Sequence, residues 1–290
     1  TVEQLATEID AHPEPLRRLM NVLVSTELVE KYGDDFALSS VARLIPERFL
    51  DFGDHHWQHL VRHVRGGVSV VNDQTLPHAE VEYLANKASE EWTLTPAALD
   101  AAQVLDIGKT RRGLRILEIG CGSGVFGITM AHRDPDSVVN LLDDANGLAR
   151  ARKMIASGDL ERKAEFIETE NILDLESIAE LKNESFDRVL LTGILHRLSG
   201  DEVLRLIPQL YRLVKSEREL AIIDVFPGQE NGEVQRAVFE LELGLRTAAG
   251  RLQDPTRLEA TLKEAGFGKV QFAHLPSPPY YWGLTLAQRL

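Results

Sequence analysis

The chain has 290 residues, of which 43% are hydrophobic, and a formal net charge of −13 at pH 7. This length allows a sizeable buried core and predicts two domains. The negative charge argues against a nucleic-acid partner, because phosphates would repel the surface. No apolar run reaches the length of a membrane span, no signal peptide is visible, and the single Cys121 cannot form an internal disulfide. We therefore expect a cytoplasmic protein with no membrane partner, and we expect a natural segment before Thr1, which already lies in a helical pattern.

Residues 1–45 form a module of their own. Two helical patterns come first, and two short alternating strands follow at 28–32 and 36–39. This order predicts a helix-turn-helix with a wing. Because the candidate recognition helix carries only Arg17 and Arg18 as basic residues, we interpret the module as a packing or dimerisation domain. A DNA-binding winged helix is the alternative.

Residues 46–105 are mostly helical in pattern and contain a cluster of four histidines. The histidines are His55, His56, His59 and His63. Their i, i+4 pairs could bind a metal, but no nearby second group of ligands completes a coordination shell. We interpret them as a solvated face opposite the apolar stripe that begins at Trp57, and we predict no metal site.

The most informative stretch is 115–124, where an apolar strand ends on an acid and runs directly into a glycine-rich turn. The acid is Glu118, and the glycines are Gly120, Gly122 and Gly124. Glycines allow the backbone to turn tightly and to lie against a ligand without Cβ collisions. The helical pattern at 125–132 would then direct free N–H groups at that ligand. The stretch predicts a loop that binds a nucleotide cofactor.

A further acid lies where the next strand ends. Asp143 follows the apolar run 138–142 and precedes Asp144. A carboxylate at this position can hold the diol of a ribose.

Two cofactors compete for the loop, because residues 122–127 also satisfy the dinucleotide pattern G-x-G-x-x-G. In that pattern the first glycine directly follows the strand, as Gly120 does and Gly122 does not. Glu118 also suits a ligand with an ammonium group better than a pyrophosphate. The loop therefore resembles the S-adenosylmethionine loop of class I methyltransferases. NAD is the alternative, and a turn that binds nothing is the non-functional interpretation.

Strand and helix patterns alternate after the loop. The strands are expected at 164–168, 186–192 and 220–226, and the helices at 145–158, 175–182 and 201–215. This alternation predicts a parallel sheet covered on both faces, with ligands at the carboxyl ends of its strands. The last strands, 269–275 and 280–287, are joined by a turn too short for a crossover helix, so they should be antiparallel.

Polar residues stand at two further strand ends. Thr192 and His196 follow one strand, and Asp224 ends the next. A histidine that faces a cleft there can take a proton from a substrate hydroxyl, and a neighbouring carboxylate can fix its tautomer. A capping or packing role for His196 is the alternative.

With these motifs the whole chain resembles the winged-helix O-methyltransferases, the family of caffeate, hydroxyindole and polyketide O-methyltransferases. The winged module, the 115–124 loop, Asp143, Leu195-His196 and the ending 264–267 carry the resemblance. It implies an α/β fold with a Rossmann-like seven-stranded sheet and an antiparallel C-terminal hairpin at 106–290, preceded by a winged-helix domain at 1–45 and an acceptor-lining region at 46–105. It also implies a homodimer.

The resemblance assigns roles to the candidate residues. It makes His196 the general base, Asp224 its support and Asp143 the ribose ligand. Adenine would be held by Asn171 and Ile172. The predicted cofactor set is completed by Glu118, Gly120, Gly122, Gly124, Asp144 and Thr192.

The chain departs from the family pattern at several positions. Arg197 and Leu252 stand where family members carry acids, and Trp92 is the nearest large residue to the family's aromatic linker position. We predict an S-adenosylmethionine-dependent O-methyltransferase of a small apolar or aromatic hydroxylated metabolite. The alternatives are a relative that keeps the cofactor without transferring its methyl group, and a winged-helix regulator that senses a ligand.

Overall fold

The computed structural model describes most of the chain. The described residues are 1–25, 28–39, 59–67, 69, 94–158, 160–227, 233–247, 249–275 and 282–290. They fall into two compact units, Thr1–His55 and His56–Leu290. Outside the described residues lie the predicted boundary at 45, His55, His56, Trp57, Trp92 and the turn 276–279, so the domain limits stay a prediction.

The first unit has the predicted order of two helices and a hairpin. Its elements are α1 (Val2–Glu8), α2 (Pro13–Ser25), β1 (Val29–Tyr32) and β2 (Asp35–Leu38), with β1 and β2 antiparallel. A small core of Val2, Ala6, Leu16, Met20 and Val29 holds them together. Hydrophobic side chains also lie on the surface of this unit, among them Leu19 and Val22, which are 52% and 55% exposed.

The second unit alternates strands and helices. Its helices are α4 (Leu60–Gly66), α6 (Thr95–Val104), α7 (Val125–Arg133), α8 (Ala145–Ser157), α9 (Gly200–Leu213), α10 (Glu233–Arg246) and α11 (Pro255–Glu264), and its 3₁₀ turns are η4 (Glu161–Lys163), η5 (Leu175–Ser177) and η6 (Leu195–Arg197). Its strands are β3 (Arg115–Ile119), β4 (Val138–Asp143), β5 (Ala164–Glu168), β6 (Phe186–Thr192), β7 (Val214–Val225), β8 (Phe267–His274) and β9 (Trp282–Arg289). In the part of the chain described here, no helix combines the length and apolar character needed to cross a bilayer.

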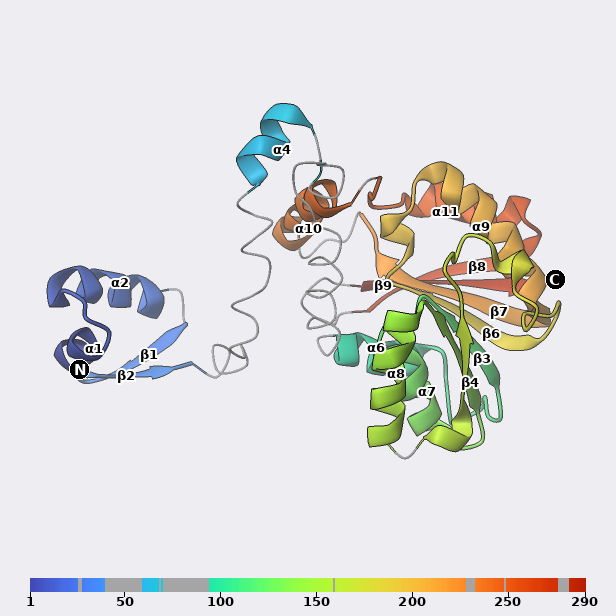
Figure 1. The fold of residues 1–290 in the computed structure, drawn as a ribbon, viewed down its shortest axis with the longest axis horizontal. Coiled ribbons are helices and arrows are strands. Elements are labelled where there is room, and N and C mark those ends of the chain that lie inside the picture. The colour runs from blue at the N-terminus through green and yellow to red at the C-terminus, as the bar shows by residue number, and fades with distance from the viewer. Residues whose placement is uncertain are drawn as a thin grey trace. The chain divides into compact units, whose positions relative to one another are not determined.

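The strands form one seven-stranded sheet in the order β5-β4-β3-β6-β7-β9-β8. Strands β3 to β7 pair in parallel, whereas β9 is antiparallel to both β7 and β8. The predicted Rossmann-like sheet with its antiparallel C-terminal hairpin is confirmed (Figure 1).

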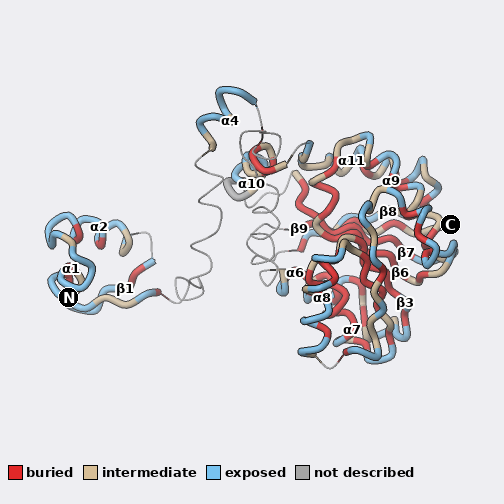
Figure 2. The backbone as a smooth tube through the Cα atoms, in the orientation of Figure 1, coloured by how far each residue is buried: buried red, intermediate tan, exposed pale blue. Residues whose placement is uncertain are grey.

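Both faces of the sheet are buried, as parallel strands require. Successive strand residues point to opposite faces, so Leu190 joins the core under α6, α7 and α8, while Val189 and Leu191 join the core under α9 and α11. Figure 2 shows the central strands as the most continuously buried part of the unit.

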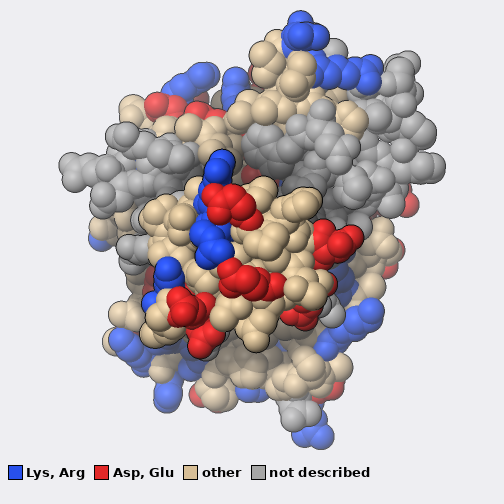
Figure 3. All heavy atoms as spheres, turned by 90° about the vertical axis from the view of Figure 1, so that its left-hand side faces the viewer, with Lys and Arg blue, Asp and Glu red and all other residues tan. Residues whose placement is uncertain are grey.

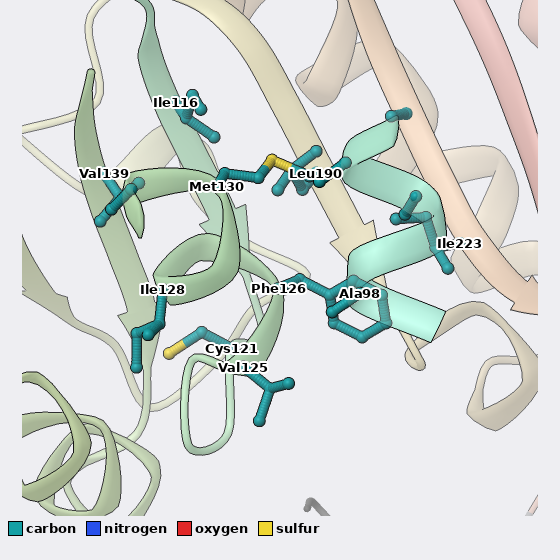
Figure 4. Close-up of a cluster of buried hydrophobic side chains, with 14 of the residues drawn as sticks. Ala98, Ile116, Cys121, Val125, Phe126, Ile128, Met130, Val139, Leu190 and Ile223 are labelled. Carbon is teal, nitrogen blue, oxygen red and sulfur yellow. The ribbon is translucent and has the colours of Figure 1, made fainter. Parts of the chain in front are cut away.

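The core on the first face reaches the glycine loop. Ala98 of α6, Phe126 of α7 and Ile223 of β7 converge there, and Cys121 of the loop belongs to the same cluster (Figure 4). The thiol is buried among apolar side chains. Cys121 is therefore a small packing residue, and the loop rests on a close-packed base.

The predicted helix at 175–182 is wrong, because this segment forms only the short turn η5. Side chains of α9 bind the backbone that a helix would use. The Leu175 N–H donates to Gln209 Oε1 at 2.8 Å, and Arg212 Nη2 donates to the Leu175 carbonyl at 2.8 Å. Tertiary hydrogen bonds thus replace the helical ladder.

The predicted start of a strand at 220 is also wrong, since β7 begins at Val214, directly after α9. The polar and charged sequence 215–219 gives no apolar strand pattern, so it does not predict this extension. In the structure, Val214 nevertheless pairs with Phe186 of β6. Lys215 and Arg218 form ion pairs with Asp187, at 3.0 Å and 3.4 Å, and so remain compatible with a paired strand.

A buried ionic cluster lies on β6 and β7, toward their amino ends. Arg188 Nη2 lies 2.5 Å from Glu219 Oε2, and Arg111 also pairs with Glu219. Burial lowers the pKa of Arg188 to about 10, against the attraction of Glu219. Within the described structure, its Nε and Nη1 atoms have no hydrogen-bond partner. Removing the carboxylate partner of a buried cation of this kind would strongly destabilise the fold.

Candidate functional site

The candidate site lies at the carboxyl edge of the parallel strands. Because β3, β4, β6 and β7 run in the same direction, the residues that follow them meet at one edge. Gly120 follows β3, Asp143 ends β4, Thr192 ends β6 and Asp224 lies near the end of β7. The sheet therefore brings together residues from four separate parts of the sequence.

The glycine loop needs its glycines for conformation. Gly120, Gly122 and Gly124 have φ values of 66°, 57° and 77°, in the left-handed region that side chains disfavour. A Cβ on Gly120 would lie 2.4 Å from Ile194 Cδ1. Backbone rather than side chain therefore forms this surface, as the motif predicts.

Asp143 holds the glycine loop against the end of β4. Its Oδ2 accepts from the Gly122 N–H at 2.6 Å, and its Oδ1 accepts from the Asp144 N–H at 2.8 Å. A carboxylate has about four lone-pair positions, so two such bonds leave capacity for a ligand diol. Asp144 caps α8 by accepting from the Gly147 N–H at 2.7 Å. A helix-cap role thus accounts for the position of Asp144.

Glu118 lies inside the protein beneath the loop. Its Oε2 accepts from the Gly127 N–H at 2.8 Å, and its Oε1 accepts from the Thr192 hydroxyl at 2.9 Å. The side chain is fully buried. Through these bonds Glu118 ties the first turn of α7 to the end of β6, so it sets the shape of the site from below; direct contact with a cofactor stays a prediction.

Asn171 and Ile172 follow β5, next to the end of β4. The Thr169 N–H donates to the Asp143 carbonyl at 3.0 Å and so joins the two strand ends. Asn171 is exposed, and its Oδ1 accepts from the Leu173 N–H at 3.0 Å in a local turn. This turn places Asn171 and the half-buried Ile172 beside the Asp143 side of the edge.

His196 and Asp224 form a buried pair at the other side of the edge. His196 Nδ1 lies 2.6 Å from Asp224 Oδ1, and the His196 backbone N–H donates to Asp224 Oδ2 at 3.2 Å. A third bond comes from the Val225 N–H, at 2.7 Å. Since the carboxylate accepts from Nδ1, a neutral imidazole keeps its lone pair on Nε2. The structure therefore joins the two residues that were predicted to be catalytic, and the role of Nε2 as a base stays a prediction.

The loop before α11 supports η6, on which His196 stands. The Arg251 N–H donates to the His196 carbonyl at 2.8 Å, and Gln253 Nε2 donates to the carbonyls of Leu195 and Leu198 at 3.3 Å and 3.1 Å. Leu252, at a position where the resemblance expects an acid, packs against the apolar core. One backbone N–H and the side-chain amide of Gln253 thus hold the carbonyls of η6 and of Leu198 from this side.

Helix α10 adds residues that the sequence analysis did not identify. The Phe239 ring meets the His196 ring edge to face, with centroids 5.1 Å apart. Glu242 lies one turn further along the helix, where burial raises its pKa. The available signal was the spacing of Phe239, Glu242 and Arg246, which fall on one helical face.

The described residues contain no cluster of three or more His, Cys, Asp or Glu side chains that could hold a metal ion. His59 and His63, the two histidines of the predicted polar face that the structure describes, lie at the start of α4 and within it.

Residues 116–217 match a family model described as "Methyltransferase domain". No curated protein sequence matches the chain.

Solved structures share the fold. An O-methyltransferase family protein from Burkholderia thailandensis has a TM-score of 0.76 and 20% identity, covering 100% of this chain and 88% of that chain. Human N-acetylserotonin methyltransferase in complex with SAM has a TM-score of 0.73 and 18% identity, covering 99% and 86%. An N,N-8-amino-8-demethyl-D-riboflavin dimethyltransferase from Streptomyces davawensis has a TM-score of 0.68 and 21% identity, covering 100% and 89%. These likenesses confirm the predicted fold.

Proposed function

We propose that this chain, in which residues 116–217 form a methyltransferase domain, transfers the methyl group of S-adenosylmethionine to a hydroxyl of a small apolar or aromatic metabolite. The observation that carries the proposal is the buried contact of 2.6 Å between His196 Nδ1 and Asp224 Oδ1 at the edge that also holds the glycine loop. A cofactor loop and an oriented base at one edge are what methyl transfer to a hydroxyl requires.

The residues at this edge fit the cofactor. Gly120, Gly122 and Gly124 form a side-chain-free surface, and Asp143 faces the ribose position with lone pairs to spare. Asn171 and Ile172 would hold the adenine, while Glu118 and Thr192 keep the loop in shape. Bound S-adenosylmethionine supplies an electrophilic methyl group on a positively charged sulfonium, which suits an edge rich in carboxylates.

His196 performs the proton chemistry in this proposal. With the cofactor bound, Nε2 would accept the proton of the acceptor hydroxyl, so that the oxygen could take the methyl group as the sulfonium S–C bond breaks and S-adenosylhomocysteine leaves. Asp224 stabilises the imidazolium that forms through its contact with Nδ1. The rest of the protein supplies proximity and alignment of the two reactants.

The proposed assembly is a homodimer that forms through the first unit. Apolar side chains on its surface support this, because a core of five buried residues leaves Ile9, Leu19 and Val22 more than half exposed. Light scattering at micromolar concentration should give twice the mass of the chain.

The charges of the first unit support a packing role rather than DNA binding. Arg17 pairs with Glu3 at 2.6 Å, and Arg18 pairs with Glu14 at 3.2 Å. The face of the molecule shown in Figure 3 likewise carries acidic and basic side chains next to one another. A gel-shift assay with random DNA at moderate salt should show no complex, and a shift would favour the regulator.

The test of function uses S-adenosylmethionine with a labelled methyl group and a panel of phenols, hydroxyindoles and aromatic amines. The amines are included because one solved structure of this fold is named as a dimethyltransferase of an amino-substituted riboflavin. We expect label in phenolic products. Cofactor binding without transfer to any acceptor would favour the non-transferring relative, and label confined to amines would overturn transfer to oxygen.

A further inference from the structure

Helix α10 contacts the His196 ring and carries three chemically distinct side chains on one helical face. Phe239 packs edge to face on the imidazole, with ring planes at 73°. Glu242 and Arg246 follow at three and seven positions along the helix and form an ion pair, with Glu242 Oε1 2.8 Å from Arg246 Nη1. Their side chains are only 16% and 8% exposed. The contact with Phe239 holds the pair's helical face toward His196.

We propose that Glu242 is a positioning residue for His196, a second carboxylate that stabilises the imidazolium from α10 while Asp224 stabilises it from β7. The effect of Glu242 on turnover rests on the proposed function. Its effect on the protonation of His196 does not.

Three observations support this role. Glu242 lies one helical turn from Phe239, whose ring packs on the His196 imidazole, and both titratable side chains are largely buried, so an attraction between them would exceed its value in water. Arg246 fixes the rotamer of Glu242 through one carboxylate oxygen. Burial also raises the pKa of Glu242, although Arg246 and His196 act to lower it. The carboxylate therefore lies where little water can screen its charge.

Other groups near His196 also favour or oppose its imidazolium form. Asp224 favours the imidazolium through a direct bond. Arg246 opposes it by repulsion. From α4, His63 approaches α10, because its Nε2 would lie 3.2 Å from a Cβ placed on Gly244. The loop before α11 meets His196 through the backbone N–H of Arg251.

The experiment is a nuclear magnetic resonance titration of the histidine rings in the full chain. The His196 signal is the one missing from His196→Gln among nine histidines. Glu242→Gln removes a negative charge from the helical face that meets the imidazole, so the His196 midpoint should move to lower pH by about one unit. Arg246→Gln leaves the carboxylate unopposed and should move the midpoint to higher pH. Glu240→Gln, on the exposed side of α10, is the matched control and should leave it unchanged.

Opposite shifts in the two variants support the proposal, and they would be accompanied by the same shifts in the acid limb of kcat with cofactor affinity unchanged. A Glu242→Gln midpoint equal to that of the control overturns it. If the circular dichroism of Glu242→Gln shows that it is not folded, Glu242→Asp and Arg246→Gln are titrated instead. An unchanged His196 midpoint in Glu242→Asp, together with a midpoint at higher pH in Arg246→Gln, supports the proposal. An unchanged midpoint in Arg246→Gln overturns it. Because the titration needs no methyl transfer, an inactive chain that shows the shifts contradicts only the proposed function.

Discussion

The two ends of the same sheet use charge differently. On the amino-end side of β6 and β7, carboxylates meet full cations: Glu219 binds the buried Arg188, and Asp187 binds Lys215 and Arg218. At the carboxyl end, Asp143 accepts from the backbone N–H groups of Gly122 and Asp144, and Asp224 accepts from backbone N–H groups and from His196.

This difference has a physical consequence. Ion pairs cancel charge inside the fold, so the charged residues at the amino end stabilise the folded state without a ligand. Backbone N–H groups carry partial charges, so they orient a carboxylate without neutralising it. The carboxyl end therefore retains a negative field that favours a cationic cofactor and an imidazolium. If this account is correct, changes at the two ends must affect different measurements.

The largest expected effect is on turnover, from a change at the carboxyl end. His196→Ala should lower kcat for a hydroxyl acceptor by about 10²–10⁴-fold, because the base is lost. Calorimetry should show nearly unchanged cofactor affinity. Loss of both cofactor binding and folding stability would instead assign His196 a packing role.

A change at the amino end should affect folding instead. Glu219→Gln leaves the buried Arg188 without its counter-charge and should reduce the free energy of unfolding by about 3–5 kcal/mol in a denaturant titration. Glu165→Gln is the matched control, because its 3.3 Å contact with Arg115 lies on the surface and should be worth less than about 1 kcal/mol. Equal losses of unfolding free energy in the two variants would show that the buried ion pair of Glu219 does not stabilise the fold.

A smaller effect is expected on cofactor affinity. Asp143→Ala should weaken binding by roughly 1.5–3 kcal/mol, the usual worth of hydrogen bonds to a charged group. Asp136→Ala, which changes an exposed acid elsewhere in the unit, should not alter the affinity measured by calorimetry. An unchanged Kd in Asp143→Ala would mean that the ribose is held by other residues.

The smallest effect concerns acid stability between α7 and β4. Although burial acts to raise it, the pKa of Asp134 is lowered, because hydrogen bonds from Ser137, Asp136 and Gly113 favour the carboxylate. A lowered folded-state pKa adds stability above the unfolded-state value, and this stability is lost as the pH falls through the folded-state value. Asp134→Asn should therefore cost about 1 kcal/mol at neutral pH, with the difference from wild type narrowing below about pH 4. A difference independent of pH would contradict this assignment.

Local sequence was enough to predict the elements whose pattern and packing agree. The glycine loop, Asp143 and the antiparallel C-terminal strands are examples, since conformation and strand order follow from adjacent residues. The missed features depend on distant contacts. Gln209 and Arg212 divert the segment at 175–182 from a helix, and no local pattern reveals them.

The candidate site shows the same division. His196 and Asp224 could be paired from the sequence, because parallel strands bring their ends to one edge. Glu242 could not, because its approach to His196 depends on how α10 packs over η6, which no strand register specifies. The support for η6 from the loop before α11 likewise depends on tertiary packing, since it comes from the backbone N–H of Arg251 and the side chain of Gln253.

The central claim is that the carboxyl edge is built for a sulfonium nucleoside. Isothermal titration calorimetry of the full chain with S-adenosylmethionine, S-adenosylhomocysteine and NAD tests it most directly. The account predicts saturable binding of the two methionine cofactors and none of NAD. Tight binding of NAD, with no heat from either methionine cofactor, would contradict it.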